Sequence, residues 1–148
     1  MAKAFRFPLQ KVLEIRKHKE DQKAIELGQA RHELFKEQQN LERLNRQKEN
    51  LFASVDEQKI KKMDVVNLQV TESYLVDLNE KIKSQKITIK NKQQLVDEKR
   101  QELLKVSQEK KIVEKLKERQ WQAHKKDVRK ELNKMEDEVA IRVTQKGK

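Results

Sequence analysis

Thirty residues, Leu75 to Leu104, decide the fold, and they read LVDLNEKIKSQKITIKNKQQLVDEKRQELL. An aliphatic residue recurs in this stretch every seven positions, at Leu75, Ile82, Ile89, Val96 and Leu103. A second position of the same heptad is aliphatic at Leu78, Val106 and Val113. Such a repeat predicts a long helix that buries one narrow stripe against a partner helix.

A similar repeat precedes it in the chain. One heptad position holds Leu13, Leu27, Leu34, Leu41 and Val55, and the other holds Leu9, Ala30, Leu44 and Leu51. Polar residues interrupt this seam at Arg16, Glu20, Lys23, Glu37 and Lys48. Pro8 suits the first turn of a helix, where its missing N–H costs nothing. We therefore predict a helix over residues 7–57, with weak pairing around Arg16 to Lys23.

The heptad fails between the two tracts. The residues from Met63 to Val70 are irregular and rich in β-branched side chains, with Asp64 as a candidate N-cap. We expect a bend with a short helical turn over residues 58–71 and a second helix over residues 72–144. One uninterrupted helix is the alternative, but at 1.5 Å per residue it would be about 200 Å long. Folding back lets the two stripes bury each other, so the predicted fold is all-α, a long antiparallel two-helix coiled-coil hairpin forming a single domain over residues 1–148.

The apolar phase changes towards the C-terminus. The later series Trp121, Val128, Met135 with Leu132 and Val139 lies four residues out of step with the earlier one. A four-residue stutter locally unwinds a supercoil. Because the second helix is the longer one, we expect residues beyond about Gln120 to overhang or to lie beside the N-terminus. Both termini then lie at one end of the hairpin and the bend at the other.

Composition limits the class of protein. Hydrophobic residues make up 34% of the 148 residues and charged residues 41%, whereas globular domains are nearer half apolar and a quarter charged. With no cysteine there are no disulfides and no thiolate metal sites. The longest apolar runs are pairs such as Val65-Val66, too short to span a bilayer. The net charge of +11 favours acidic partners. We expect a cytoplasmic protein that reaches a membrane only through a partner.

Residues for catalysis or metal binding are scarce. His18, His32 and His124 stand alone, without metal-ligand spacing, and are interpreted as plain helix-surface residues. A thin two-helix rod offers no pocket in which paired carboxylates would acquire different pKa values. The lysine clusters are interleaved with acids, and aromatic residues make up only 4% of the chain, so nucleic-acid binding is not indicated. The expectation is a protein that is not an enzyme and uses no cofactor.

Three single residues leave alternatives open. Gly28 in mid-helix is either a tolerated weak spot or a place where another backbone approaches closely. Trp121 is either a seam residue or an exposed binding anchor. Tyr74 flanks the seam position Leu75, so its ring should be partly exposed, at the edge of the core or in an apolar docking patch.

Short motifs resemble those of the flagellar FliJ family. The chain opens with Phe5-Arg6-Phe7-Pro8-Leu9, followed by Val12-Leu13-Glu14-Ile15-Arg16. The step Tyr74-Leu75…Leu78 and the ending Asp137-Glu138-Val139-Ala140-Ile141-Arg142 are also similar. The N-terminal motif is the most specific, and the resemblance extends over the whole chain.

The resemblance implies a role in flagellum biogenesis, chemotaxis and type III protein transport. It implies a hairpin similar to the γ subunit of rotary ATPases, acting as a stalk inserted into the hexameric export ATPase. Such a stalk promotes the assembly and activity of the ring and contacts the cytoplasmic domain of the membrane export gate. A general chaperone or escort role, with export chaperones as further partners, is also implied. The expected location is peripheral, at the cytoplasmic face of the inner membrane at the flagellar basal body.

Two sets of site residues follow from the resemblance. The ring-binding residues would be Phe5, Arg6, Phe7, Leu9, Arg16, Trp121, Lys125, Arg129 and Arg142. The gate-binding residues would be Leu44, Leu51, Tyr74 and Leu78. Gln47 and Lys81 are polar residues at positions where a gate-binding surface would be expected to be apolar.

Two further readings compete with the flagellar stalk. The first is the equivalent stalk of a virulence injectisome, and the Phe-x-Phe-Pro-Leu opening favours the flagellar branch over it. The second is a homodimeric coiled-coil scaffold. We expect the stalk to be a monomer by itself, whereas a scaffold would be a dimer whose melting depends on concentration.

Overall fold

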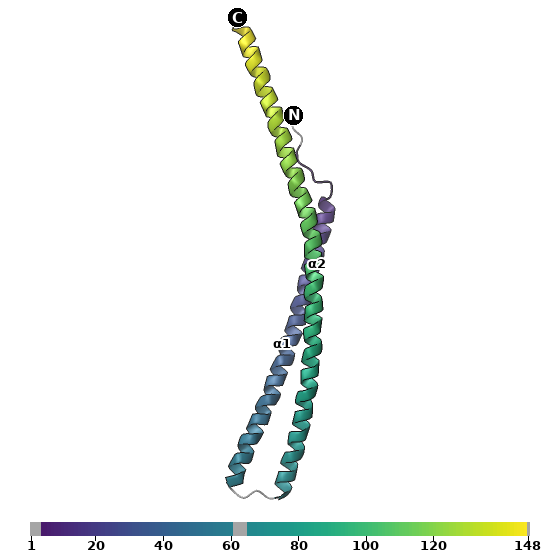
Figure 1. Ribbon diagram of the computed structural model, residues 1–148, viewed down its shortest axis with the longest axis vertical. Coiled ribbons are helices and arrows are strands. Elements are labelled where there is room, and N and C mark those ends of the chain that lie inside the picture. The colour runs from purple at the N-terminus through teal and green to yellow at the C-terminus, as the bar shows by residue number, and fades with distance from the viewer. Residues whose placement is uncertain (1–3, 61–64, 148) are drawn as a thin grey trace. The chain divides into compact units, whose positions relative to one another are not determined.

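The computed structural model describes residues 4–60 and 65–147 and contains two α-helices. α1 spans Gln10–Ile60 and α2 spans Val65–Lys146. The protein is an all-α helical hairpin, with α2 packed beside α1 (Figure 1). Part of the expected bend, residues 61–64 with Met63 and the candidate N-cap Asp64, lies outside the described residues. Residues 65–71, expected to hold a separate short helical turn, already belong to α2.

The chain divides into two compact units, each built from a piece of both helices. The terminal unit consists of Met1–Gln22 and Leu104–Lys148, and the middle unit of Lys23–Leu103. Each unit has its own cluster of buried apolar side chains.

The core of the middle unit lies on the predicted heptad seam. Leu27, Ala30, Leu34 and Val96 form one buried cluster, and Ile89, Leu95 and Leu103 pack against it. Leu78 and Val96 are the most deeply buried side chains, each 2% exposed. A large aliphatic side chain gains about 1.5–3 kcal/mol from full burial, which explains why a sequence with so few apolar residues places them on one stripe.

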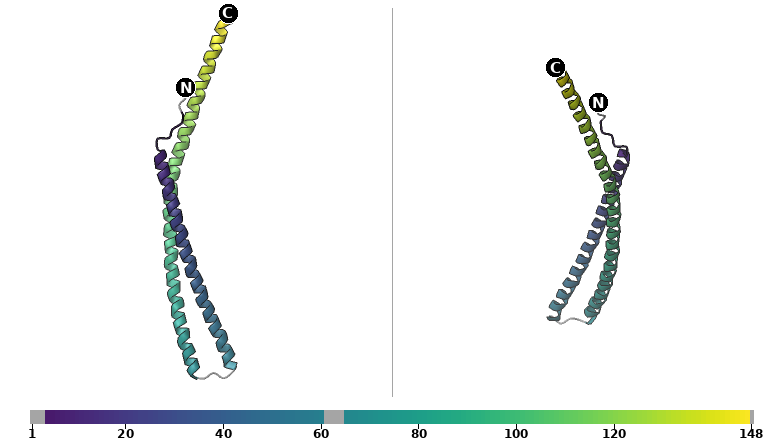
Figure 2. Two further views of the ribbon diagram at one scale, coloured as in Figure 1. Left: turned by 180° about the vertical axis from the view of Figure 1, so that it is seen from behind. Right: turned by 45° about the horizontal axis from the view of Figure 1, so that its top comes forward.

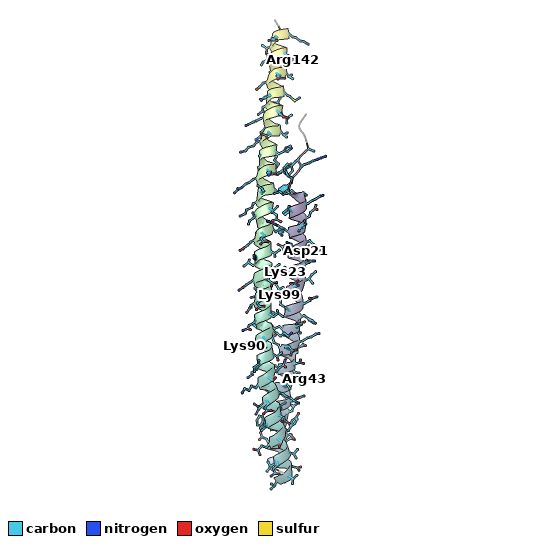
Figure 3. The ribbon with its side chains drawn as sticks, turned by 90° about the vertical axis from the view of Figure 1, so that its right-hand side faces the viewer. Asp21, Lys23, Arg43, Lys90, Lys99 and Arg142 are labelled. Atoms are coloured by element: carbon cyan, nitrogen blue, oxygen red, sulfur yellow. The ribbon has the colours of Figure 1, made fainter. Side chains whose placement is uncertain are left out.

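Polar side chains reach across the same seam and define its antiparallel register. The pairs that they form are Lys23 with Glu102, Glu26 with Lys99, Glu33 with Lys92 and Glu37 with Gln85. The residue number rises along α1 while it falls along α2, so the two helices run in opposite directions. Figure 3 shows Lys23 and Lys99 on neighbouring turns of the two helices. The interruptions of the first tract at Lys23 and Glu37 are therefore bridged by ion pairs and hydrogen bonds.

The terminal unit has a core of Phe7, Leu13 and Val113, with Phe5 and Val12 packed against it. Pro8 and Leu9 form a turn before α1. The amide of Gln10 donates to the carbonyl of Phe7 at 3.1 Å. Because of this turn, α1 begins at Gln10 rather than near Phe7, and Leu9 is 39% exposed instead of lying in the seam as predicted.

Hydrogen bonds fill the polar part of the terminal unit. The Arg16 guanidinium donates to the carbonyl oxygen of Glu109 at 2.8 Å. The Lys110 ammonium lies 2.8 Å from the Glu20 carboxylate. This hydrogen bond lowers the pKa of Glu20, with a further contribution from Ser107, and raises the pKa of Lys110. The polar seam residues Arg16 and Glu20 thus both have hydrogen-bond partners on α2.

The last part of α2 departs from the predicted phase. Lys117, Gln120 and His124 continue the earlier heptad as half-buried residues, while Trp121 is 37% exposed. The earlier heptad therefore continues through His124, and the shifted phase is visible only at Val128, which is half-buried while Asp127 is exposed. From Arg129 to Gly147 every residue is exposed, and both views in Figure 2 show these turns with no part of α1 beside them. Residues 129–147 thus agree with the expected overhang, whereas Trp121 and His124 agree with the other alternative, a segment beside the N-terminus, because both pack on Phe5.

Candidate interaction surfaces

An aromatic cluster fastens the segment before α1 to α2. The ring of Phe5 lies 5.1 Å from the ring of Trp121, at an interplanar angle of 61°, and 5.5 Å from the ring of His124. The rings of Trp121 and His124 are stacked at 6.0 Å. Edge-to-face pairs of this kind contribute about 0.5–1.5 kcal/mol beyond the area that they bury. The cluster of Phe5, Trp121 and His124 therefore holds the N-terminal segment against the second helix.

A cation and a hollow adjoin the aromatic cluster. The Lys125 ammonium lies 5.0 Å from the centre of the Trp121 ring, in the geometry of a cation–π contact. A shallow hollow of about 440 Å³ is lined by Phe5, Leu13, Lys17, Glu114, Lys117, Glu118 and Trp121. An apolar floor with a charged rim suits an apolar side chain of a protein partner.

His124 is the residue of this surface that the sequence did not single out. His18 and His32 are exposed, as interpreted, but His124 is half-buried between Phe5 and Trp121. The interpretation of His124 as a plain surface residue is wrong. Its burial could have been predicted from the unshifted heptad, because His124 lies seven residues after Lys117 and about one helical turn from Trp121.

The nine expected ring-binding residues all lie in the terminal unit, but in different surroundings. Phe7 is buried, Phe5 is half-buried, and Arg16 is bound to the Glu109 carbonyl. The remaining side chains of the set are exposed, namely Arg6, Leu9, Trp121, Lys125, Arg129 and Arg142. The structure thus brings Phe5, Phe7 and Trp121 together as structural elements and leaves Arg6, Arg129 and Arg142 available to a partner.

Charge is distributed unevenly between the two units. The terminal unit has 20 Lys and Arg against 11 Asp and Glu, a formal charge of +9. The middle unit has 16 Lys and Arg against 14 Asp and Glu, a formal charge of +2. Most of the attraction for an acidic partner therefore belongs to the terminal unit.

The four expected gate-binding residues lie in the middle unit. Leu78 is 2% exposed and belongs to the interior, while Leu44 and Leu51 are half-buried. Tyr74 is 45% exposed, which confirms the prediction of a partly exposed ring. A partner that meets this conformation can touch Tyr74 and the edges of Leu44 and Leu51, but not Leu78.

A polar hollow borders Leu44. It has a volume of about 530 Å³ and is lined by Arg43, Leu44, Gln47, Lys81, Ser84 and Gln85. Gln47 and Lys81, the two residues that depart from an apolar surface, both line it. This part of the middle unit therefore favours a partner that offers hydrogen bonds and charge as well as apolar contact.

An exposed aromatic residue in the same unit was missed. Phe52 follows Leu51 on α1, is 47% exposed, and has the Lys48 ammonium 6.0 Å from its ring centre. Its exposure could have been predicted from the sequence, because Phe52 is an aromatic residue that lies outside the heptad seam of the predicted helix.

The sequence model of one protein family, described as Flagellar FliJ protein, matches residues 5–148 and so covers both surfaces. The chain belongs to the FliJ family. This FliJ-family protein is accordingly a component of the flagellar protein export apparatus. No curated protein and no solved structure matches it significantly.

Two kinds of site were searched for over residues 4–60 and 65–147 of this FliJ-family chain. No group of three or more His, Cys, Asp or Glu side chains there could hold a metal ion. Over the same two ranges, neither helix has a stretch that is long and apolar enough to cross a bilayer.

Proposed function

We propose that this FliJ-family chain is the central stalk of the flagellar export ATPase, with the terminal unit inserted into the hexameric ring. One observation carries the proposal: Phe5 packs 5.1 Å from Trp121, so the N-terminal segment is held on α2 within the terminal unit, whose formal charge is +9. In this role the stalk promotes assembly and activity of the ring and is not itself an enzyme.

Electrostatic attraction explains how such a stalk would enter a ring. Arg6, Lys125, Arg129 and Arg142 are exposed and available to carboxylates that line a channel. Charged surfaces of opposite sign speed association and lose their attraction as salt is added. A polar contact of this kind also allows the stalk to rotate or rock, because no large apolar interface has to separate.

The last turns of α2 add a narrow apolar contact to this surface. Leu132, Met135 and Val139 recur at spacings of three and four residues and are 55–59% exposed. Residues at this spacing lie on one face of a helix. The stripe that they form would provide a small apolar contact with the ATPase ring.

The middle unit is proposed to bind the cytoplasmic domain of the export gate. The accessible part of this surface consists of Tyr74 with the edges of Leu44 and Leu51. Through both partners the protein would be held at the cytoplasmic face of the inner membrane, at the flagellar basal body. The general chaperone or escort role is proposed on the family alone.

The test is ATP hydrolysis by the cognate export ATPase with and without the full-length protein, together with ring counting by negative-stain microscopy. Activity and ring number should rise together, and truncation after Gln120 should abolish both effects. Reversing the charges of the exposed residues Arg6, Arg129 and Arg142 to Glu should weaken stimulation at least tenfold at low salt. Full stimulation by this variant would refute the electrostatic part of the proposal.

A matched variant controls for net charge. Arg31, Arg43 and Lys90 are exposed in the middle unit, and changing all three to Glu alters the net charge by the same amount. Figure 3 shows Arg43 and Lys90 on the middle unit and Arg142 near the C-terminal end of α2. Stimulation should survive in this control, and equal loss in both variants would mean that only total charge matters.

Binding to the gate is tested with Tyr74→Ala, whose exposed ring can be removed without opening the core. Its affinity for the isolated cytoplasmic domain of the gate should fall several-fold. Phe35→Ala, which removes a 55% exposed ring from the same unit, is the control. If both variants bind as well as the unmodified protein, the gate surface lies elsewhere.

The competing function, a homodimeric scaffold, is separated by light scattering. The stalk proposal expects a monomer at micromolar concentration. A stable dimer whose melting temperature rises with concentration, together with no effect on the ATPase, would favour the scaffold.

A further inference from the structure

A basic face runs along the outside of α2 in the terminal unit. It consists of Lys111, Lys115, Arg119, Lys126, Arg129 and Lys130, all of them exposed. Successive members are separated by four, four, seven, three and one residues. These separations keep the six side chains on one side of an α-helix, opposite the buried Val113 and the half-buried Gln120 and His124.

No acidic residue interrupts this face between Gln108 and Asn133. The other outward positions in that stretch are Ile112 and Gln122, which are uncharged. Glu109, Asp127 and Glu131 stand four or seven residues from seam positions and so lie on the seam side of the helix. Glu114 and Glu118 line the hollow near Trp121. Glu118 also borders the basic face, where its carboxylate accepts a hydrogen bond from Gln122 at 2.9 Å. Apart from Glu118 at this border, the acids that are interleaved with lysines in the sequence are separated from the basic face on the helix surface.

The six cations are also free of internal partners. Within the described part of the chain, no carboxylate lies within ion-pairing distance of any of them. The lysines on the seam side behave differently, because Lys110 pairs with Glu20 and Lys117 donates to Gln10. Apart from Lys111, whose charge contributes to lowering the pKa of Glu20, the basic face is available to a ligand outside the chain.

We propose that the basic face binds the anionic headgroups of a lipid membrane surface directly. From Lys111 to Lys130 the row covers nineteen steps along the helix, about 28 Å at 1.5 Å per residue. A straight row of cations can touch a flat surface with all its members at once. Clusters of four to eight Lys and Arg on one helix surface are the usual recognition element for anionic lipids.

Other polyanions fit this face less well. Single-stranded nucleic acid would be expected to find stacking aromatic side chains, and the face contains none. A specific acidic protein would be expected to find an apolar anchor at the centre of its interface. The exposed aliphatic residues nearby are Leu104, which lies before the row, and Ile112 and Leu116, which lie along its edge rather than at its centre. A surface of charge without anchors matches peripheral attachment by electrostatics alone.

This inference goes beyond the proposed stalk function and does not depend on it. The sequence suggested that the protein reaches a membrane only through a partner. The basic face instead provides a direct contact, which would concentrate the protein at the membrane before it meets the export machinery.

The experiment is co-sedimentation of the full-length protein with vesicles of phosphatidylglycerol and phosphatidylcholine, and with vesicles of phosphatidylcholine alone. Binding is expected to the anionic vesicles only and should weaken as salt is added. Each Lys or Arg near an anionic surface strengthens binding about fivefold, so changing Lys111, Lys115 and Arg119 to Gln should weaken binding about 100-fold. Gln is a good helix former, and circular dichroism verifies that the helix is retained.

The matched control changes Lys83, Lys86 and Lys90, which are exposed in the middle unit, to Gln. It removes the same charge and should bind within about twofold of the unmodified protein. Four results would overturn the proposal: no binding to anionic vesicles, equal binding to neutral ones, equal loss in the two variants, or tighter binding to a DNA duplex at the same salt concentration.

Discussion

The Lys23 ammonium on α1 lies 3.1 Å from the Glu102 carboxylate on α2. Glu26 and Lys99 complete a closed arrangement, since each lysine lies within 3.5 Å of both carboxylates. The side chains are 27–44% exposed, so water screens these pairs. We infer that they specify the register of the hairpin more than they add to its stability.

The first prediction concerns pH and this group of four side chains. Hydrogen bonds from Lys23, with a smaller contribution from Lys99, lower the pKa of Glu26 and of Glu102. In turn, the hydrogen bond to Glu102 raises the pKa of Lys23, and the hydrogen bond to Glu26 raises the pKa of Lys99. Stability from the carboxylates is present above their ordinary pKa of 4.5 and is lost as the pH falls through their lower folded values. Stability from the lysines is present below 10.5 and is lost as the pH rises through their higher folded values.

The double variant Glu26→Gln, Glu102→Gln tests this prediction. Its melting temperature should be below that of the unmodified protein at neutral pH, and the two curves should converge as the pH falls below 4.5. Glu49→Gln with Glu98→Gln, two exposed carboxylates, should show no such convergence. A constant difference between the curves at all pH values would mean that the ion pairs are not responsible.

The second prediction concerns Gly28 in the middle of α1. Apart from the adjoining residues and backbone of α1 itself, no described atom lies within 4 Å of the place that a Cβ would occupy, so no other backbone requires a glycine there. Gly28→Ala should raise the free energy of unfolding by about 0.5–1 kcal/mol, because alanine loses less backbone entropy in a helix. Urea unfolding followed by circular dichroism measures the gain, and Gln29→Ala is the matched control with little expected change. A loss of stability would show that the glycine has a role in the hairpin.

The third prediction contrasts a buried with an exposed leucine. Leu78 is 2% exposed and Leu132 is 55% exposed. Leu78→Ala should cost about 2–5 kcal/mol of unfolding free energy, because it removes buried apolar atoms and leaves a cavity. Leu132→Ala should change it by less than about 0.5 kcal/mol. Denaturant unfolding decides the matter, and similar values for both variants would contradict the assignment of the core.

The fourth prediction uses Trp121, the single tryptophan, as a reporter. Phe5→Ala should remove the contact at 5.1 Å and release the N-terminal segment, so that acrylamide quenches Trp121 fluorescence more strongly and the emission shifts to the red. The loss of the ring pair should cost about 0.5–1.5 kcal/mol beyond the lost burial. Arg6→Ala alters the exposed neighbour and should leave the fluorescence unchanged. Unchanged quenching in Phe5→Ala would mean that the aromatic cluster does not form.

Much of the fold could be predicted, because heptad spacing is a local property. All the predicted seam positions from Leu13 to Leu51 and from Leu75 to Val113 are buried or half-buried. Leu9, at the start of the first tract, is exposed. The start of α1 could not be predicted, because the turn at Pro8 and Leu9 depends on where Phe7 is buried against Val113.

The candidate surfaces were predicted less well, for a reason that Trp121 and His124 illustrate. Apolar spacing placed Trp121 in a new seam and left His124 at the surface. In the structure the Phe5 ring lies 5.1 Å from the ring of Trp121 and 5.5 Å from the ring of His124, so both residues belong to one cluster. Phe5 lies more than one hundred residues away in the chain, and no local pattern contains that contact.

The sequence by itself determined that the chain forms two long helices with one apolar stripe each, because residues at heptad spacing lie on one side of a helix whatever surrounds it. It also determined the excess of positive charge and the family. Only the tertiary structure decided the register of the two helices, the partners of Lys23 and Glu102, and which cations of the basic face remain exposed and without an ion pair. Heptad positions repeat every seven residues, so several registers satisfy the stripe, and long-range packing and ion pairs select one of them.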